Sequence, residues 1–273
     1  MALTQSSAQE IAPLAQLAST DLSGADLSSK DLYRINLSGA NLSGANLSET
    51  GLLGANLAGA KLTGATLTKA DLRGVSLRDA DLTQADLTGA YLFRADLQGC
   101  NLTGATLAEA ELKVALYDSK TQWPEGFRYK SSGAVGPNAS LNGAYLNTAN
   151  LKDADLSGAM MFGTYLSGAN LQGANLAGAG LSGANLQKAF LIGANLQGVN
   201  LAGTELQRAD LRGTNLTDAD FSEVGSIAGA DFSGAVGLSD KNRAKLLSHA
   251  AAELDEWNAF TRQTTRQSLE KKG

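Results

Sequence analysis

The sequence predicts an all-β solenoid in which the chain turns a corner every five residues, and three observations indicate this fold class. Leucine recurs at every fifth position from Leu22 to Leu112, 19 times in succession, and a second series from Leu141 to Phe221 adds 17 positions with only Met161 and Phe221 departing from leucine. Alanine stands two residues before the centre in 13 of the first 19 repeats and in 13 of the following 17. The period of five matches neither the 3.6 of a helix nor the 2 of a long strand.

The repeating unit reads Ala-(Asn/Asp)-Leu-X-(Gly/X), as in residues 40–44 and 209–213. We expect leucine and alanine to point to a common axis and the other three positions to face solvent. Glycine recurs two residues after the centre, for example at Gly24 and Gly39, where a tight turn can require a positive φ. Stacked coils would satisfy their backbone groups as a sheet does, at ~4.8 Å per layer.

With these residues the chain resembles the pentapeptide-repeat family, whose fold is a right-handed quadrilateral β-helix. The resemblance covers residues 20–117 and 139–234. Four repeats form one coil in that family, so the 36 repeats imply about nine coils. Each buried leucine would contribute roughly 1.5–3 kcal/mol to stability. Cys100 occupies an alanine position, so we expect it to be a small buried residue rather than a reactive thiol.

Two segments interrupt or precede the repeats. Residues 1–19 are expected to form an N-terminal lead-in or cap. Residues 118–138 break the period and are expected to form an interrupting loop, similar to inserts in cyanobacterial members of the family. Its Trp123 and Phe127 are expected to fold back on the solenoid. A knob that binds a partner is the alternative.

The C-terminal segment, residues 235–273, is expected to be helical. After Phe221 the register slips by one residue, and from Ser239 apolar residues recur with helical spacing on one face. The residues of that face are Leu247, Ala250, Ala251, Leu254 and Trp257. Two interpretations stay open: a helix that seals the end of the solenoid, which stacked repeats require, or a homodimer contact such as C-terminal segments of some family members provide.

Composition and motifs indicate that the chain is not an enzyme. One cysteine and one histidine exclude a disulfide framework and make a zinc site or a histidine-based triad improbable. The G-x-G-x-x-G match at residues 178–183 lies inside the repeat, without the strand and helix that dinucleotide binding needs. Carboxylate pairs such as Asp79 and Asp81 have no acid–base partner nearby, and a solvated surface explains them. We therefore predict no catalytic residues, no cofactor and no metal.

Net charge and hydropathy bear on whether the chain binds nucleic acid and on where in the cell it is located. The formal net charge of −5 gives no reason to expect nucleic-acid binding. No apolar run approaches the ~18 residues of a membrane span, and residues 1–20 lack a basic segment followed by an apolar one. We expect a cytoplasmic protein.

The outward positions supply the candidate site. Residues 20 apart share a face of a four-sided coil, and we call the face centred on Leu32, Leu52, Leu72, Leu92 and Leu112 the Leu32 face. Its candidate binding residues are Tyr33, Arg34, Leu53, Arg73, Tyr91, Phe93, Arg94 and Lys113. Aromatic and arginine side chains are favoured in interface hot spots. The pattern predicts a scaffold or regulator that binds another protein, although scattered aromatics on a repeat surface are an open alternative.

A second apolar patch and a second function are alternatives to this prediction. In the second run Met160, Phe162, Tyr165, Phe190 and Ile192 form a less aligned patch. Certain family members mimic DNA and bind topoisomerase, which requires a dominantly acidic rod. Residues 1–238 carry 22 acidic and 15 basic residues, a net charge of −7, and the Leu32 face contains arginines. The DNA-mimic hypothesis is therefore the weaker one.

Overall fold

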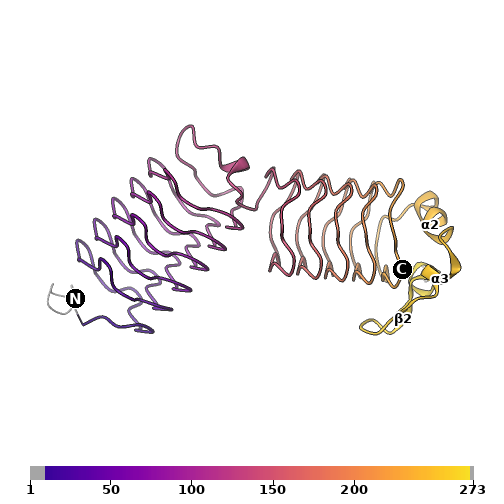
Figure 1. The fold of residues 1–273 in the computed structure, drawn as a ribbon, viewed down its shortest axis with the longest axis horizontal. Coiled ribbons are helices and arrows are strands. Elements are labelled where there is room, and N and C mark those ends of the chain that lie inside the picture. The colour runs from indigo at the N-terminus through magenta and orange to yellow at the C-terminus, as the bar shows by residue number, and fades with distance from the viewer. Residues whose placement is uncertain (1–9, 271–273) are drawn as a thin grey trace. The chain divides into compact units, whose positions relative to one another are not determined.

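The computed structural model describes residues 10–270 and divides the chain into two compact units. Unit 1 is Met1–Val135 and unit 2 is Gly136–Gly273. In each unit the chain winds into stacked coils (Figure 1). Single parallel bridges join residues 20 apart, for example Asp31 to Gly51 and Gly51 to Asp71. Four repeats therefore complete one turn of the coil, as the sequence predicts.

Backbone hydrogen bonds tie each coil to the next. The Leu22 amide donates to the Asn41 carbonyl at 2.7 Å, and the Asn41 amide donates to the Thr20 carbonyl at 2.9 Å. Inside each corner a second bond closes the turn, as from the Ala25 amide to the Leu22 carbonyl at 3.1 Å. The bridges begin before residue 20, because Gln16 already pairs with Asn36.

The residue two after each central leucine adopts a left-handed conformation. Gly24 has φ of 64° and Gly39 of 65°, as expected for glycine at this corner. Arg34 and Arg94 occupy the same corner with φ of 50° and 59°. A charged side chain is thus held in a conformation that L residues populate sparsely.

The interior is a column of leucine and alanine. Leu27, Leu72 and Leu186 are fully buried, as are most alanines two residues before each centre. Inward threonines form hydrogen bonds in this interior: Thr50 donates Oγ1 to the Leu27 carbonyl at 2.9 Å, and Thr204 donates Oγ1 to the Leu181 carbonyl at 2.8 Å. Each acceptor lies 23 residues earlier in the chain. Cys100 does the same, with Sγ 2.7 Å from the Leu77 carbonyl, and burial raises the pKa of its thiol to about 12. The thiol is a buried structural group.

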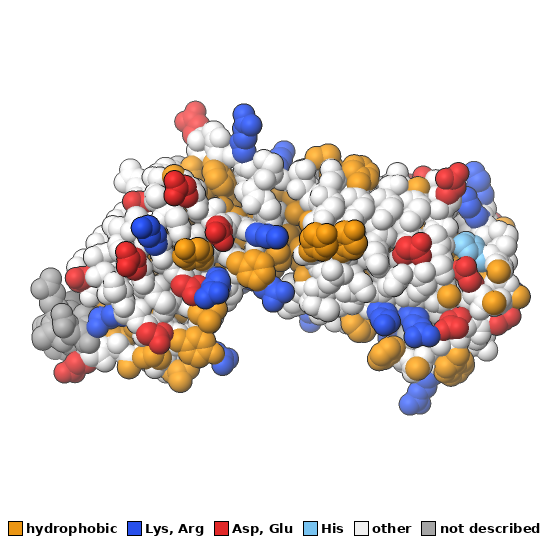
Figure 2. Space-filling model, in the orientation of Figure 1, with side chains coloured by type: hydrophobic (Ala, Val, Ile, Leu, Met, Phe, Trp, Pro, Cys, Tyr) orange, Lys and Arg blue, Asp and Glu red, His pale blue; other side chains and the backbone are white. Residues whose placement is uncertain are grey.

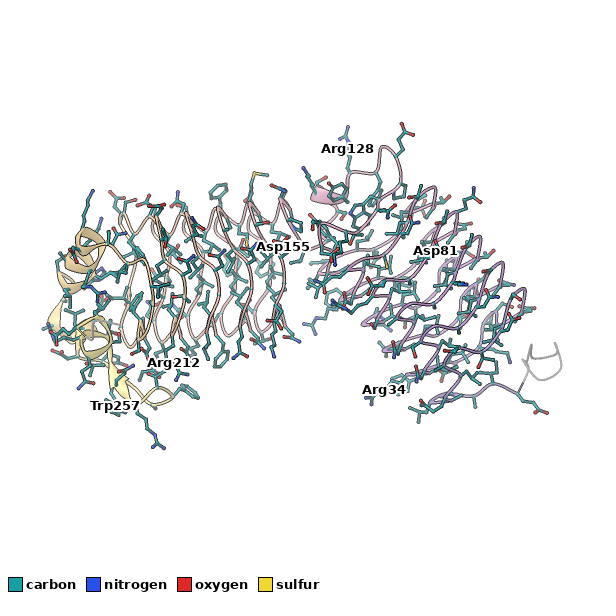
Figure 3. All side chains as sticks on the ribbon, turned by 180° about the vertical axis from the view of Figure 1, so that it is seen from behind. Arg34, Asp81, Arg128, Asp155, Arg212 and Trp257 are labelled. Carbon is teal, nitrogen blue, oxygen red and sulfur yellow. The ribbon has the colours of Figure 1, made fainter. Side chains whose placement is uncertain are left out.

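The residue before each leucine is less exposed to solvent than the sequence suggests. Asn175 donates Nδ2 to Asp155 Oδ1 at 3.1 Å, and Asn195 and Asn215 continue this ladder at 3.1 and 3.0 Å. In many repeats Oδ1 of the same residue accepts the amide two residues on, as Asn41 does from Ser43 at 3.2 Å. The side chain therefore stabilises both the corner and the stacking. Figure 3 labels Asp155 at the start of this ladder.

The interrupting loop folds against unit 1. It contains the short 3-10 helix η1, Tyr129–Ser131. The Trp123 ring stacks on Tyr129 and Phe127 with centroids 5.2 and 5.5 Å apart, and it meets the buried Tyr117 edge-on at 5.6 Å. Gln122 also bridges to Asn101 of the preceding coil. These ring contacts join the loop to the last coil of its own unit.

The C-terminal segment holds three short α-helices and a hairpin, so the prediction of one continuous helix is wrong in detail. The elements are α2 (Asp240–Leu247), α3 (Ala251–Leu254), β1 (Trp257–Asn258), β2 (Gln263–Thr264) and α4 (Thr265–Glu270). Ser239 caps α2, and its Oγ accepts the Asn242 amide at 3.2 Å.

Local hydrogen bonds explain why the helix breaks. Ser248 donates Oγ to the Lys245 carbonyl at 2.6 Å, and Ala250 has an extended ψ of 141°. Of the predicted apolar face, Leu254 is buried, but Trp257 lies in β1 and is 55% exposed, and Ala250 and Ala251 are exposed.

The buried apolar side chains of this segment are Leu246, Leu254 and Leu269, and they cover the end of unit 2. The Phe232 amide donates to Ser268 Oγ at 3.1 Å, and Thr265 donates Oγ1 to the Ile227 carbonyl at 3.0 Å. No helix within residues 10–270 has the length and apolar character needed to cross a bilayer.

Candidate protein-binding face of unit 1

The Leu32 face consists of two parallel columns of outward side chains. Each central leucine points inward, so the residues before and after it project outward on either side. One column contains Asp31, Gly51, Asp71, Tyr91 and Glu111, which are bridged in succession. The other contains Tyr33, Leu53, Arg73, Phe93 and Lys113. At ~4.8 Å per coil, this second column is a strip of about 19 Å.

The exposed large hydrophobic side chains of unit 1 all lie on this face in the part of the unit that the structure describes. They are Leu14, Tyr33, Leu53 and Tyr91. Leu14 was not among the predicted residues. Its amide donates to the Tyr33 carbonyl at 3.0 Å. Leu14 therefore occupies the same corner of the coil as Arg34, one coil before it. The sequence could have indicated this position, because Leu17 continues the leucine period five residues before Leu22 and so extends the coils toward Leu14.

Two of the predicted arginines stack on neighbouring rings. The guanidinium carbon of Arg94 lies 5.1 Å from the Phe93 ring centroid, and that of Arg34 lies 5.9 Å from the Tyr33 ring centroid. Arg34 lies at the surface of unit 1 in Figure 3. Because neither guanidinium has an ion pair among the described residues, both can still meet a carboxylate of a partner.

Arg73 behaves differently from the other two arginines. It makes a bidentate pair with Asp71, with Nε to Oδ1 at 2.7 Å and NH2 to Oδ2 at 2.6 Å. The hydrogen bond from Arg73 lowers the pKa of the Asp71 carboxyl, and the carboxylate raises the pKa of Arg73. The Arg73 charge is therefore largely satisfied within the chain.

A groove of about 490 Å³ runs between the two columns. In three successive coils it is lined by the two residues that flank the central leucine: Asp71, Arg73, Tyr91, Phe93, Glu111 and Lys113. On one wall of the groove Tyr91 lies between the acidic residues Asp71 and Glu111. On the other wall Phe93 lies between the basic residues Arg73 and Lys113. Hydrophobic and basic side chains adjoin on the visible surface of unit 1 in Figure 2. Asp71 and Glu111 were not predicted as lining residues.

The aromatic side chains of unit 2 are distributed over several faces. Tyr145 and Tyr165 stack with centroids 4.7 Å apart and planes within 5°. Phe162 lies on the adjacent face, where an added Cβ at Gly180 would meet its ring at 2.7 Å. Phe190 lies on a third face. The less aligned patch predicted from the sequence is thus split between faces.

Residues 10–270 contain no group of three or more His, Cys, Asp or Glu side chains arranged to hold a metal ion. The imidazole of His249 contacts Glu253 at 3.3 Å, and this carboxylate also accepts the Ile227 amide at 3.0 Å. His249 and Glu253 therefore serve the packing of the C-terminal segment.

A four-sided β-solenoid with a leucine interior and a variable outer surface defines a class of repeat proteins. The family model for pentapeptide repeats matches in eight copies, over residues 15–52, 52–89, 85–113, 138–168, 159–198 and 194–236. The chain belongs to the pentapeptide-repeat family. No curated protein sequence matches it significantly.

Solved structures of pentapeptide-repeat proteins are similar to the chain. HetL, from the cyanobacterium Nostoc sp. strain PCC 7120 and involved in heterocyst differentiation regulation, is 32% identical, with 82% of this chain and 90% of HetL covered and a TM-score of 0.29. Alr5209 from the same strain is 34% identical over 44% of this chain and 82% of its own, with a TM-score of 0.28. QnrB1, a plasmid-mediated fluoroquinolone resistance protein, is 19% identical over 85% and 95%, with a TM-score of 0.30.

Proposed function

We propose that the chain is a non-enzymatic scaffold or regulator in the cytoplasm that binds another protein through the Leu32 face. The observation that carries the proposal is the concentration of exposed apolar side chains on one of four faces of unit 1. The interior is satisfied by leucine and alanine, so an outward aromatic residue adds little to folding. A partner that buries these rings explains their alignment.

The chemistry of the face supports a protein as the partner. Tyrosine, phenylalanine and arginine supply large apolar areas together with hydrogen-bond donors, and interfaces are enriched in them. Arg94 is held against Phe93, so less rotamer freedom is lost when it pairs with a partner carboxylate. The groove between Tyr91 and Phe93 can receive a side chain of the partner.

The charge distribution argues against a DNA mimic. Asp71, Asp96 and Asp210 are paired with arginines of the same chain. In the ladder that begins at the Asp155 carboxylate, the next three side chains are the neutral amides of Asn175, Asn195 and Asn215. At these positions the carboxylates do not form the continuous acidic stripe that a DNA mimic would need.

The proposal can be tested by quantitative pull-down from an extract of the organism that encodes the chain. The test variant replaces Tyr33, Leu53 and Phe93 with serine. The control variant replaces Tyr145, Phe162 and Tyr165 with serine, which removes as many large outward side chains from unit 2. We expect proteins captured by the unaltered chain to fall at least tenfold with the test variant and to be retained with the control. Equal capture by both variants, with melting transitions unchanged, would refute the proposal.

A photo-crosslinking residue makes the test direct. Placed at Leu53, it lies in the middle of the Leu32 face, and placed at Ala177 it lies on the unit 2 face that carries the amide ladder. The partner should crosslink from position 53 and not from position 177.

A further inference from the structure

The Leu32 face is divided lengthwise by charge. The column before the central leucine contains the acidic residues Asp31, Asp71 and Glu111, and the column after it contains the basic residues Arg73 and Lys113. Neither column contains a residue of the opposite sign. Residues two apart in an extended segment are separated by roughly 6.6 Å, so the two columns run side by side along the solenoid. One side of this face is therefore acidic and the other basic.

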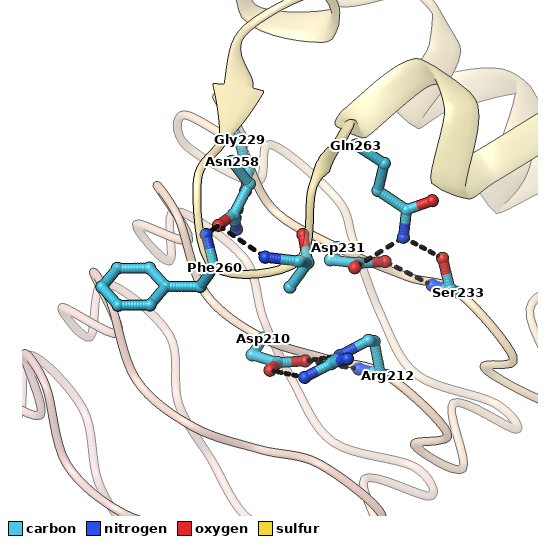
Figure 4. Close-up of polar contacts among 9 residues, drawn as sticks. Asp210, Arg212, Gly229, Asp231, Ser233, Asn258, Phe260 and Gln263 are labelled. Carbon is cyan, nitrogen blue, oxygen red and sulfur yellow. Dashed lines mark hydrogen bonds and ion pairs between the residues drawn. The ribbon is translucent and has the colours of Figure 1, made fainter.

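An acidic and a basic residue that flank the same leucine can pair within the chain. Asp210 makes such a pair with Arg212 in unit 2 at 2.7 Å (Figure 4), and Asp71 makes one in unit 1. Glu111 and Lys113 flank a central leucine in the same way, but both are exposed and neither has an ion pair among the described residues. The closed pairs present no net charge, whereas the Glu111 and Lys113 charges are available to groups outside the chain.

A gap adjoins the exposed side chain of Leu53. Among the repeats, glycine stands directly before the centre only at Gly51 and Gly180. At Gly180 the ring of Phe162 occupies the space of a side chain, 2.7 Å from an added Cβ. At Gly51 the atom nearest to an added Cβ is Asp31 Oδ1 at 3.6 Å, and φ is not positive, so the backbone does not require glycine there. The space over Gly51 is open, and Leu53 beside it is 39% exposed.

A two-fold axis along the groove makes this face complementary to itself. Rotation about such an axis keeps two solenoids parallel and places the column before the leucine in one copy opposite the column after it in the other. In an isologous contact of this kind, residue i meets residue j of the same coil and j meets i. Glu111 of one copy then meets Lys113 of the other, and Tyr91 meets Phe93.

A two-fold axis across the solenoid gives the opposite result. It turns one copy end to end and places like columns opposite each other. With the coil of Leu72 at the centre, Asp31 of one copy would meet Glu111 of the other. Like charges opposite each other disfavour an interface. The charges of the face therefore select the parallel arrangement.

We infer that the chain associates with a second copy of itself through the Leu32 face, as a parallel two-fold dimer. Leu53 of each copy fills the space over Gly51 of the other, and the Tyr91 and Phe93 rings fill the groove of about 490 Å³. The inference rests on the proposed use of this face as a binding surface and names a second copy as an occupant. Because both occupants use the same face, the dimer withholds it from the proposed partner.

The test is sedimentation equilibrium of the purified full-length chain over a range of concentrations. We expect a reversible equilibrium between monomer and dimer that shifts toward monomer as the NaCl concentration rises, because salt screens exposed ion pairs. A chain that stays monomeric up to about 1 mM would overturn the inference.

A variant that fills the gap identifies the contact surface. Gly51→Asn introduces a side chain that other repeats carry at this position, as at Asn36 and Asn56, so the melting transition of unit 1 should not change. It should weaken dimerisation by about tenfold or more, because Leu53 of the second copy loses its space. The control Ser76→Asn adds the same side chain at the same repeat position on another face and should leave the dimer intact.

Two results with these variants would overturn the inference. One is a dimer with unaltered affinity in Gly51→Asn, as expected for association through residues 235–273. The other is an equal loss of affinity in Gly51→Asn and Ser76→Asn.

Charge reversal tests the pairing of the columns. Glu111→Lys and Lys113→Glu each turn two ion pairs of the dimer into two repulsive contacts, so each should weaken dimerisation about tenfold. The variant that carries both substitutions restores the pairs and should recover most of the affinity. Failure of the double variant to recover would overturn the inference. So would stronger association of Glu111→Lys, whose lysine would meet Asp31 in the end-to-end arrangement.

Cysteine crosslinking tests the orientation of the two copies. Gly51→Cys and Leu53→Cys chains are mixed and oxidised, and the native thiol does not compete because burial raises the pKa of Cys100 to about 12. In the parallel dimer the mixed disulfide should form faster than the disulfide of either variant with itself. The control mixture combines Gly51→Cys with Tyr91→Cys, which the end-to-end arrangement would bring together. Faster crosslinking in the control mixture would overturn the inference.

These measurements and the pull-down fail independently. A monomeric chain that still captures another protein through the Leu32 face would overturn only the dimer. A chain that dimerises through this face, while its Tyr33, Leu53 and Phe93 serine variant captures as much from the extract as the unaltered chain does, would refute only the proposed function.

Discussion

Units 1 and 2 have the same interior and different outer surfaces. Both bury the central residue, which is leucine except at Met161 and Phe221, and in most repeats they bury alanine two residues before it. Unit 1 places its exposed large hydrophobic side chains on the Leu32 face, within the described residues. The described coils of unit 2 carry them on all four faces: Met160 and Phe162, Tyr145 and Tyr165, Phe190, and Val236. Since the inward pattern is common to both, the fold does not impose either distribution.

The units also differ in what is built onto the coils. Unit 2 carries α2, α3, the β1–β2 hairpin and α4 against its last coil, and residues of the hairpin and the coils together line a hollow of about 240 Å³. Unit 1 carries the interrupting loop, whose rings pack on Tyr117. The comparison teaches that the repeat supplies a stable frame, whereas the outer surface of each unit is determined by its outward positions and its non-repeat segments.

The largest effect is expected from a charge on the axis. Leu72→Asp in unit 1 or Leu186→Asp in unit 2 should destabilise the altered unit by more than about 4 kcal/mol, because the carboxylate has no route to water. Trp123 lies in unit 1 and Trp257 in unit 2, so tryptophan fluorescence in Trp257→Phe or Trp123→Phe backgrounds reports each unit separately. If Leu72→Asp left the melting of unit 1 unchanged, or Leu186→Asp that of unit 2, the conclusion that these leucines point inward would be contradicted.

Removal of residues 239–273 should cause the next largest change. It exposes Phe232 and the last coil of unit 2, and it removes buried Leu246, Leu254 and Leu269. An open, apolar coil end pairs readily with other chains. We expect the truncated chain to associate, as measured by light scattering after size-exclusion chromatography. If it stayed as soluble and monomeric as the full-length chain, neither a cap nor a dimer contact could be assigned to this segment.

Acid should affect unit 1 more than unit 2. Hydrogen bonds from neighbouring hydroxyl, amide and guanidinium groups lower the pKa of carboxyl groups, which are Asp21, Asp26, Asp71, Asp81 and Asp118 in unit 1 and Asp220 and Asp255 in unit 2. A lowered pKa stabilises the fold above the unfolded value of about 3.9, and that contribution is lost as pH falls below it.

The measurement is an acid titration of the two single-tryptophan variants. The Trp123 signal should change at a higher pH than the Trp257 signal. Asp81→Asn removes one titrating group from unit 1 and should make the acid-induced loss of its stability shallower. Simultaneous transitions with unaltered slopes would show that these carboxylates do not distinguish the units.

The smallest effect is expected at Cys100. Cys100→Thr should change the free energy of unfolding by less than about 1 kcal/mol, because Thr50 and Thr204 make the same hydrogen bond from the equivalent position. The native thiol should resist alkylation until unit 1 unfolds, since burial raises its pKa to about 12. Rapid alkylation of the folded chain would indicate that the interior of unit 1 is open to solvent.

The sequence by itself determined the repeat, the inward positions and the family. A period of five with leucine and alanine leaves few packing solutions, so the pattern alone places Leu27 and Leu186 inside, where both are buried. The same period placed Tyr33 and Phe93 together on one face, because residues 20 apart must be neighbours once four repeats make a coil.

Only the tertiary structure decided the contacts that depend on side-chain direction or on long-range packing. The amide ladder through Asn175 and Asn195 requires neighbouring coils in register, which the sequence pattern leaves implicit. The break after α2 depends on Ser248 and on burial against unit 2, and helical periodicity alone misplaced Trp257. The hollow lined by coil and hairpin residues combines Lys188 with Phe260, and no local sequence pattern links residues that only folding brings together.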